Sequence, residues 1–427
     1  MNSNLSRRDM LRLVGVGAGA LGLGGLAACA PSADGPEEDK ATSATDFSFA
    51  SWSLADNASK AKIEQLMSGY GSKAGVTVKG LPLAYNNYLN QLTLQVRGGQ
   101  FTGAAQMDIA WLAGLAALGK LRDLGDVAKN AGYTEAALSS GQVEGKQVGL
   151  PWTTAAIGLI ANRDLMQKAG ITSAPTTIAD FETALRALKG TGVIPYAAST
   201  KVAQLKDILI WMQTFGSPLL EGDKVTVGDD ASIEAVTWYK KLYDEKLIAP
   251  DVERVDARTL FAQGKTAMYD DAIVGRDFVV KGSPDKSIAD KLDPIARPVK
   301  NAGDKPRAVQ WGHAVVVVEG EGANTATDFA KWLTSDEQTV LGYFKDLSLP
   351  PTTTAALASE QVKTDAFTSQ FSERITATAT PNPFWKYPQY AQMETAISEH
   401  VQAVLVGKSK PADAMREAGQ AVQALIK

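Results

Sequence analysis

The sequence predicts an α/β protein with two layered domains. Short β-prone segments alternate with helical segments along the chain, a pattern typical of sheets covered by helices. The chain has 427 residues, which is more than one hydrophobic core usually fills, so two domains are expected. We find no internal repeat with a period of about 20–50 residues, which argues against a repeat architecture.

The chain begins with a segment typical of an exported lipoprotein. Residues 6–12 supply the charged start and contain a twin-arginine pattern. An uncharged stretch, Leu13–Ala28, ends in Leu-Ala-Ala directly before Cys29, as in a bacterial lipidation site. We therefore expect residues 1–28 to be a signal peptide and Cys29 to be lipidated. A simple membrane-spanning anchor is the alternative, but the stretch is short and glycine-rich for a span of about 20 residues.

Residues 29–45 are expected to form a flexible tether, because Ala, Ser, Pro, Asp and Glu predominate there without apolar periodicity. A G-x-G-x-x-G pattern occurs at Gly17–Gly22, but it lies inside the apolar signal with no strand before it, so no dinucleotide site is expected. No later segment is long and apolar enough to cross a bilayer. We expect an extracytoplasmic protein held at the cell membrane by lipidated Cys29.

Composition excludes several classes of function. The formal net charge of −4 gives no basic surface for nucleic acid. A single cysteine excludes an internal disulfide, and with only His313 and His400 as histidines a Cys/His zinc site is not expected. The chain has no G-x-S-x-G elbow, P-loop or H-E-x-x-H motif. We therefore expect no catalytic residue, no metal and no cofactor.

Folding is expected to begin near Asp46, and the first segments alternate strand and helix. Leu89, Leu92 and Val96 share one face of a helix that Gly98 ends. The expected strands are Phe47–Ser51, Val76–Val78 and a buried Asp108–Trp111, and the expected helices are Asn57–Tyr70, Tyr88–Arg97 and Leu112–Leu118.

A second series of elements follows. Thr177 and Asp180 form a capping box that opens a helix through Lys189. The further expected strands are Gln147–Leu150, Ile157–Asn162, Met268–Asp270 and Ala314–Val318. The further expected helices are Ala203–Thr214, Ala231–Glu245, Val255–Gln263, Thr325–Thr334, Asp336–Leu347, Tyr390–Val406 and Ala412–Ile426.

Four stretches carry a family resemblance: Gly149–Thr154 followed by Gly158–Leu165, the F-x-x-G-K-x-A-M-like Leu260–Met268, the helix at Ala330–Gln338, and Lys408–Leu425. In this order, behind a lipoprotein signal, they resemble the sugar-binding family of ABC-importer substrate-binding proteins that includes maltose-binding protein. The resemblance covers the chain from about Asp46. Most members have Tyr where this chain has Ala161.

The resemblance implies a two-lobed periplasmic-binding-protein-like fold, in which crossing hinge segments join the lobes and the ligand lies in the cleft between them. By analogy, lobe one would be residues 46–154 plus 314–358, and lobe two residues 155–313 plus 359–427. It also implies a monomer that captures its ligand by lobe closure and delivers it to the transmembrane subunits of an ABC permease.

A sugar presents apolar faces and a rim of hydroxyls, so its site needs flat aromatic surfaces and polar side chains. Two tryptophans inside predicted helices, Trp238 and Trp332, are expected in the core. Trp111 and Trp385 resemble cleft aromatic positions of the family. The full set of expected ligand-binding residues is Trp52, Asn87, Trp111, Trp152, Thr153, Asp270, Asp271, Trp311, His313 and Trp385.

Each of these residues has a structural alternative. A tryptophan is often a partly buried packing residue, and Asn87 could cap a helix. Asp270 and Asp271 could form a solvated turn, and His313 could be a structural histidine with its hydrogen bonds made inside the protein.

Taken together, the resemblance and the candidate residues favour reversible capture of a carbohydrate, either an oligosaccharide or a monosaccharide. The alternatives are a binding protein for another solute, a surface glycosidase using paired carboxylates, and a lipoprotein that binds another protein.

Overall fold

The computed structural model describes residues 44–57 and 59–426. The predicted signal peptide, the predicted lipidation site Cys29 and residues 29–43 of the predicted tether lie outside the described residues. The backbone N–H of Thr45 donates to Oγ1 of Thr325 at 2.9 Å. This hydrogen bond joins the beginning of the described chain to the first turn of the helix Ala323–Ser335. In the described ranges, no helix is long and apolar enough to span a membrane.

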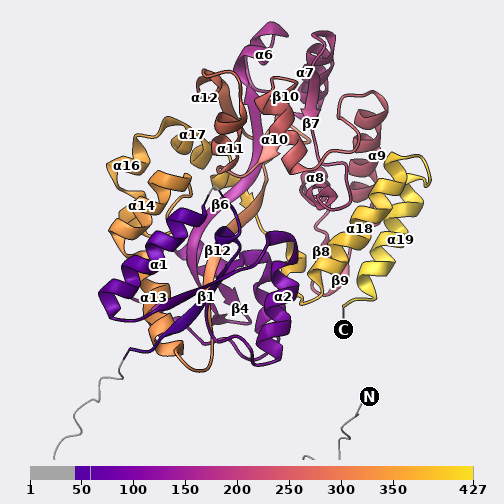
Figure 1. Cartoon of the computed structure of the whole chain (residues 1–427). Coiled ribbons are helices and arrows are strands. Elements are labelled where there is room, and N and C mark those ends of the chain that lie inside the picture. Colours follow the sequence, from indigo (N-terminus) through magenta and orange to yellow (C-terminus); the bar gives the residue numbers. More distant parts are fainter. Residues whose placement is uncertain (1–43, 58, 427) are drawn as a thin grey trace, which may run out of the picture. The chain divides into compact units, whose positions relative to one another are not determined.

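Strands from distant parts of the described chain form one mixed sheet in the order β2, β1, β3, β12, β6, β10 and β7 (Figure 1). β11 joins this sheet at β6, and β13 joins it at β12. The strands are β1 (Phe47–Ser51), β2 (Val78–Pro82), β3 (Gly103–Asp108), β6 (Gly149–Asn162), β7 (Ile194–Ala197), β10 (Thr266–Asp271), β11 (Leu292–Ile295), β12 (Ala308–Val318) and β13 (Ala379–Thr380). Two small hairpins pair β4 (Gln142–Val143) with β5 (Lys146–Gln147), and β8 (Leu220–Glu221) with β9 (Lys224–Val225).

The two long strands β6 and β12 link two groups of strands, which gives the fold its two lobes (Figure 1). The first part of β6, through Ile157, pairs with β12, whereas its last part, from Gly158, pairs with β10 and β11. β12 pairs with β3 from His313 to Val318 and with β6 over most of its length. The pairing register between β12 and β6 shifts between His313 and Ala314. This bulge therefore lies at the crossing between the lobes, where it re-aims the neighbouring side chains.

Helices cover both faces of the first group of strands. Val315 and Val317 of β12 pack against one hydrophobic cluster, and Val316 and Val318 pack against the other, as expected for residues that alternate along a strand. The first cluster joins β1 and β12 to α1 (Lys60–Ala74), α13 (Ala323–Ser335) and α14 (Glu337–Leu347), and the second joins β3 and β12 to α2 (Tyr85–Arg97) and α3 (Leu112–Ala116).

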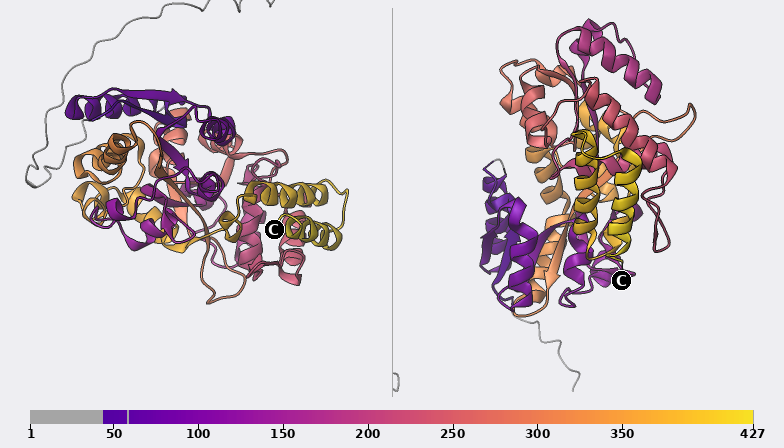
Figure 2. Two further views of the ribbon diagram at one scale, coloured as in Figure 1. Left: turned by 90° about the horizontal axis from the view of Figure 1, so that it is seen from below. Right: turned by 90° about the vertical axis from the view of Figure 1, so that its right-hand side faces the viewer.

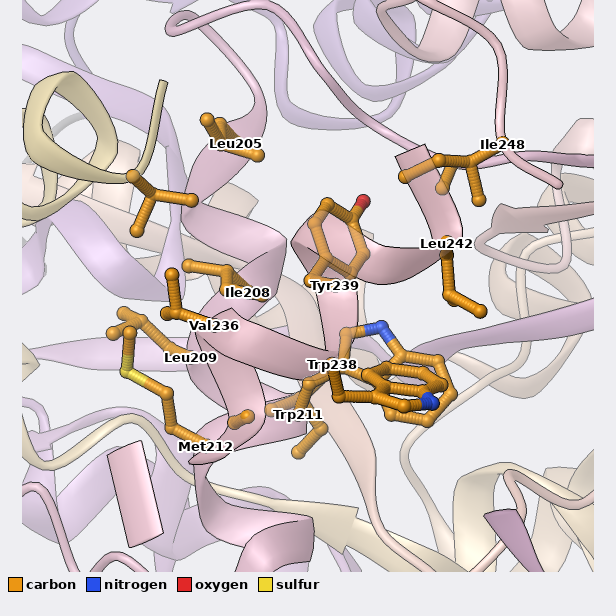
Figure 3. Close-up of a cluster of buried hydrophobic side chains, with 14 of the residues drawn as sticks. Leu205, Ile208, Leu209, Trp211, Met212, Val236, Trp238, Tyr239, Leu242 and Ile248 are labelled. Atoms are coloured by element: carbon orange, nitrogen blue, oxygen red, sulfur yellow. The ribbon is translucent and has the colours of Figure 1, made fainter. Parts of the chain in front are cut away.

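The second group of strands is layered in the same way. On one side lie α7 (Ile178–Gly190), α8 (Ile208–Phe215), α9 (Asp230–Asp244), α18 (Tyr390–Leu405) and α19 (Pro411–Gln423), and on the other α10 (Arg254–Ala262), α11 (Gly275–Gly282), α12 (Ile288–Lys291) and α17 (Ala366–Arg374). The two C-terminal helices α18 and α19 lie side by side (Figures 1 and 2). Trp211 and Trp238 meet in this core with ring centroids 4.8 Å apart (Figure 3), which confirms the core prediction for Trp238. Shorter helices are α4 (Gly125–Ala128), α5 (Glu135–Ser140), α6 (Arg163–Lys168), α15 (Thr354–Leu357) and α16 (Glu360–Lys363).

Several elements match the sequence-based expectations closely. The strand Phe47–Ser51 is as predicted, and the capping box of Thr177 and Asp180 opens α7. The helices predicted at Ala231–Glu245, Val255–Gln263, Asp336–Leu347, Tyr390–Val406 and Ala412–Ile426 are present with ends shifted by at most three residues. Apolar periodicity marks these segments, and Asp229 and Asp336 cap two of the helices, so local sequence was sufficient.

Other expectations were wrong. The predicted strand Asp108–Trp111 is a 3₁₀ turn from Ile109 on, because the Asp108 carboxylate accepts from the N–H of Ala110 and caps it. The strands predicted at Gln147–Leu150 and Ile157–Asn162 are one continuous strand through Pro151. The helix predicted at Asn57–Tyr70 begins at Lys60 and runs to Ala74, and the strand predicted at Val76–Val78 is Val78–Pro82. The start of the helix predicted at Ala203–Thr214 is a 3₁₀ turn at Leu205–Asp207.

Candidate functional site

A cavity of about 980 Å³ is lined by both strand groups and by the strands that cross between them. This volume is at the upper end of ligand pockets, which measure about 300–1,000 Å³. Its wall is built from the turn after β1, the start of α2, the turn after β3, β12, the start of α8, α10, the turn after β10, α11 and the segment 380–394. Most of these are ends of strands and starts of helices, where α/β proteins place their ligands.

One side of the cavity is aromatic. The ring of Trp52 lies 5.4 Å from that of Trp111 and 5.5 Å from that of Tyr85, and the Trp111 and Tyr85 rings are 5.1 Å apart. Trp311 and Trp385 line the same cavity and are half-buried, as is Trp111. Trp52 is 9% exposed, since the other rings cover it. Flat apolar surface is therefore available from several directions, the kind of surface that the face of a sugar ring stacks on.

His313 lies in the same wall, at the register shift between β12 and β6. Its ring is held between Trp52, 4.9 Å away, and Trp311, 4.6 Å away. The residue is 7% exposed and lines the cavity. Burial lowers the pKa of His313 to about 3, because the imidazolium would lose its hydration. His313 is therefore a neutral polar group at physiological pH.

Four buried carboxylates line the cavity, and two of them, Asp108 and Glu394, are not paired with an arginine. Asp108 accepts from the backbone N–H of Ala110 at 3.0 Å and from the Tyr85 hydroxyl at 3.2 Å, and burial raises its pKa. Glu394 accepts from Trp385 and from Asn382, so it fixes the orientation of that indole. These carboxylates keep lone pairs that can accept from ligand hydroxyls.

Two arginines on α10 also line the cavity, and both are already paired. Arg254 Nη2 lies 2.6 Å from Asp207 Oδ2, and Arg258 binds Asp271 through two contacts of 2.6 and 2.8 Å. Burial works against the charge of Arg258, but the carboxylate of Asp271 raises its pKa overall. The described lining holds seven carboxylates and four Lys or Arg side chains, so the cavity does not attract an anionic ligand.

The structure brings six of the expected ligand-binding residues to the cavity: Trp52, Trp111, Asp271, Trp311, His313 and Trp385. The other four lie elsewhere. Trp152 is 1% exposed and stacks on Tyr343 with centroids 4.5 Å apart. Thr153 is buried and donates to the carbonyl of Pro350 at 2.8 Å. Asp270 pairs with buried Arg297, and Asn87 is exposed on α2 outside the cavity.

Other cavity residues were not expected from the sequence. Three of them are Tyr85, Asp108 and Glu394. They lie in or beside predicted elements, where a polar side chain is usually interpreted as a helix cap or as part of a solvent-exposed face. For Asp108, its place at the end of a strand was a usable signal, because such positions point to the ligand edge of a parallel sheet. For Glu394, inside a helix, the sequence held no signal, since only the packing of α18 brings it to Trp385.

Comparison with known proteins places the chain in a family. Residues 65–368 match the family model described as bacterial extracellular solute-binding protein. A binding protein of Brucella abortus is 25% identical over 204 residues, which are 45% of this chain and 50% of that protein. The chain thus spans about half the length of the curated relatives that it matches.

Solved structures with the same fold include two that were determined with a bound sugar or sugar analogue. The GacH receptor of Streptomyces glaucescens, determined without ligand and with acarbose, is 23% identical with a TM-score of 0.81, over 90% of this chain and 98% of that one. The MalE3 protein of T. maritima, determined with bound maltose, is 20% identical with a TM-score of 0.77, over 90% of this chain and all of that one (100%). At these identities the likeness shows the fold.

Proposed function

The chain belongs to the bacterial extracellular solute-binding proteins, and we propose that it captures a carbohydrate in the 980 Å³ cavity and delivers it to the permease of an ABC importer. The observation that carries the proposal is the aromatic wall. Trp111, Trp311 and Trp385 present half-buried rings to one cavity, between carboxylates that accept hydrogen bonds. That combination suits a ligand with apolar faces and a hydroxyl rim.

The size and charge of the cavity support an oligosaccharide. The volume exceeds what one hexose fills, and several rings are available for successive sugar units. A phosphorylated or acidic sugar is disfavoured, because Arg254 and Arg258 are paired with Asp207 and Asp271. Maltose and acarbose, which the two similar structures bind, are the first candidates to test.

We assign the lobes as expected from the sequence, with lobe one at residues 46–154 plus 314–358 and lobe two at residues 155–313 plus 359–427. The change of partners within β6, between Ile157 and Gly158, supports a hinge close to the first boundary. The bulge between His313 and Ala314 coincides with the second. A ligand that contacts both lobes would shift the equilibrium toward a closed form by its preference for that form.

The proposal involves no chemistry on the ligand. The main alternative, a glycosidase, needs one carboxylic acid and one free carboxylate on either side of the scissile bond. Of the buried cavity carboxylates, Asp207 and Asp271 are paired with arginines, Glu394 accepts from Trp385 and Asn382, and Asp108 accepts from Tyr85 and from the N–H of Ala110. A binding protein for a non-sugar solute is the second alternative.

We infer the partners and the location from the family and the N-terminal sequence. Lipidated Cys29 and the segment 29–45 would hold a monomeric receptor at the outer side of the membrane, near its permease. The Arg7-Arg8 pair would direct export through the twin-arginine route.

Thermal unfolding of the purified protein with a panel of sugars tests this function. A ligand that binds only the folded state raises the melting temperature by mass action. Maltose, acarbose and longer maltodextrins should raise it, and their composition should be unchanged after long incubation. A rise with amino acids or peptides but with no sugar would refute the carbohydrate assignment, and hydrolysed sugar would favour the glycosidase.

A further inference from the structure

Three buried polar side chains form a connected row across the strands behind the cavity. Oγ of Ser51, at the end of β1, donates to Oε1 of Gln106 in β3 at 2.5 Å. Nε2 of Gln106 lies 3.4 Å from Nδ1 of His313 in β12. Ser51 and Gln106 are fully buried, and His313 is 7% exposed. The row therefore links the interior of the sheet to the cavity wall.

The hydrogen bonds along the row all run in one direction, with each donor on the Ser51 side. The Ser51 hydroxyl already accepts from the backbone N–H of Ser53 at 3.1 Å, which leaves its proton free for the carbonyl oxygen of Gln106. The NH₂ group of Gln106 then faces His313. An amide NH₂ can only donate, so Nδ1 of His313 must accept and carries no proton. A neutral imidazole in this setting holds its proton on Nε2.

The environment keeps the imidazole neutral and fixed. Burial lowers the pKa of His313 to about 3. The rings of Trp52 and Trp311 hold the plane of the imidazole by edge contacts, but these apolar contacts are the same for either tautomer. The contact with Gln106 is thus the one that selects the tautomer. Within the described residues the hydrogen-bond contact of the imidazole ring is at Nδ1, and the residue lines the cavity.

We propose that Gln106 is a positioning residue that holds His313 as an Nε2–H donor, and that the ligand places an acceptor oxygen there. This inference rests on the proposed function, in that it takes the cavity as the carbohydrate site. A hydroxyl, ring or glycosidic oxygen can accept this proton, whereas an ammonium group cannot. His313 thereby selects for an oxygen at one point of the ligand and leaves no buried donor unpaired.

Nuclear magnetic resonance of the ligand-free protein, with histidines labelled by ¹⁵N, tests the tautomer. The chain has two histidines, and His400 is an internal control, because its Nδ1 lies 2.7 Å from the carbonyl oxygen of Ala396 and must carry a proton. We expect the proton of His313 on Nε2, with Nδ1 unprotonated, throughout pH 5–8. A proton on Nδ1 of His313 would mean that the Gln106 amide is turned the other way, and would overturn the inference.

Two substitutions test the donor role. The amide nitrogen of glutamine reaches the place of Nε2, whereas that of asparagine reaches only the place of Nδ1. His313→Gln should therefore keep maltose affinity within about threefold, and His313→Asn should lose about tenfold, the value of one unmade hydrogen bond. Titration calorimetry with maltose measures both, and matching melting temperatures verify the folds. Equal losses in both variants would overturn the donor role. Failure of the unmutated protein to bind maltose would count against that sugar as its ligand, while the tautomer measurement still decides this inference.

Discussion

The indole N–H of Trp385 donates to Oε1 of Glu394 at 3.0 Å, and the same oxygen accepts from Asn382 at 2.7 Å. One carboxylate thus holds a cavity tryptophan and the turn that carries it. Glu394 is 6% exposed, and its second oxygen lies 3.5 Å from the ammonium of Lys206. A stacking surface that is oriented before the ligand arrives costs less ordering entropy on binding.

Loss of this surface should weaken binding. We expect Trp385→Ala to lower the affinity for the tightest sugar of the panel by about thirtyfold, because an aromatic anchor contributes about 2 kcal/mol. Trp332→Ala is the matched control. Trp332 is half-buried beside Tyr70 on α1, away from the cavity, and its loss should leave affinity unchanged. Titration calorimetry compares the two, and equal affinities would contradict a role for Trp385.

The buried pair of Arg297 and Asp270 should support stability rather than binding. Arg297 is 3% exposed, its guanidinium lies 4.5 Å from the centroid of the Trp211 ring, and Asp270 also accepts from the Tyr196 hydroxyl. Arg297→Met leaves Asp270 as an uncompensated buried charge, so we expect the free energy of unfolding to fall by about 3 kcal/mol.

Urea denaturation of the Arg297→Met variant measures this loss. Lys129→Ala, which removes an exposed partner of Asp126, is the control and should cause no measurable change. Sugar affinity of the folded Arg297→Met protein should remain as in the unmutated protein, since neither Arg297 nor Asp270 lines the cavity. If the Arg297→Met variant kept its stability but lost its sugar affinity, the pair would support binding rather than stability.

The ionised carboxylate of Asp108 should lower the free energy of unfolding at neutral pH. Burial raises its pKa above the ordinary 3.8, so the native state holds the proton more tightly than the unfolded chain does. Stability therefore falls as pH rises through the interval between 3.8 and the native pKa, and the cost persists above it. Asp108→Asn keeps the cap on Ala110 and removes the titration.

We expect the Asp108→Asn variant to melt a few degrees higher than the unmutated protein at pH 7, with the difference shrinking as pH approaches 4. It should also bind sugar more weakly, since an amide accepts fewer hydrogen bonds than a carboxylate. Thermal scans across this pH range measure the effect. A difference in melting temperature that grows toward low pH would contradict the predicted direction of the pH dependence.

Cys29 should determine where the protein stays. In cells, Cys29→Ala should release into the medium a protein that still binds its sugar, because the lipid anchor is lost and the cavity is unaffected. Fractionation and a binding assay on the medium measure this. Cys29→Ser is a second variant that should behave alike, and retention of either variant in the membrane would contradict the anchor.

Local signals explain the parts of the fold that the sequence predicted. The capping box at Thr177 and the apolar stripe of α9 depend on residues a few positions apart, so they are visible along the chain. The 3₁₀ turn after Asp108 and the passage of β6 through Pro151 were missed. Proline lacks the N–H that a ladder needs, and the pairing with β12 continues past Pro151 because β6 holds one extra residue, Trp152, where the register shifts.

The sequence by itself determined the α/β class, most of the long helices, and the short list of aromatic and polar residues from which a sugar site could be made. Tertiary structure alone decided which of them meet. Asp270 and Asp271 are neighbours on β10, yet one pairs with Arg297 in the core and the other with Arg258 at the cavity. Adjacent residues of a strand point to opposite faces, and which face meets the cavity depends on how the helices pack.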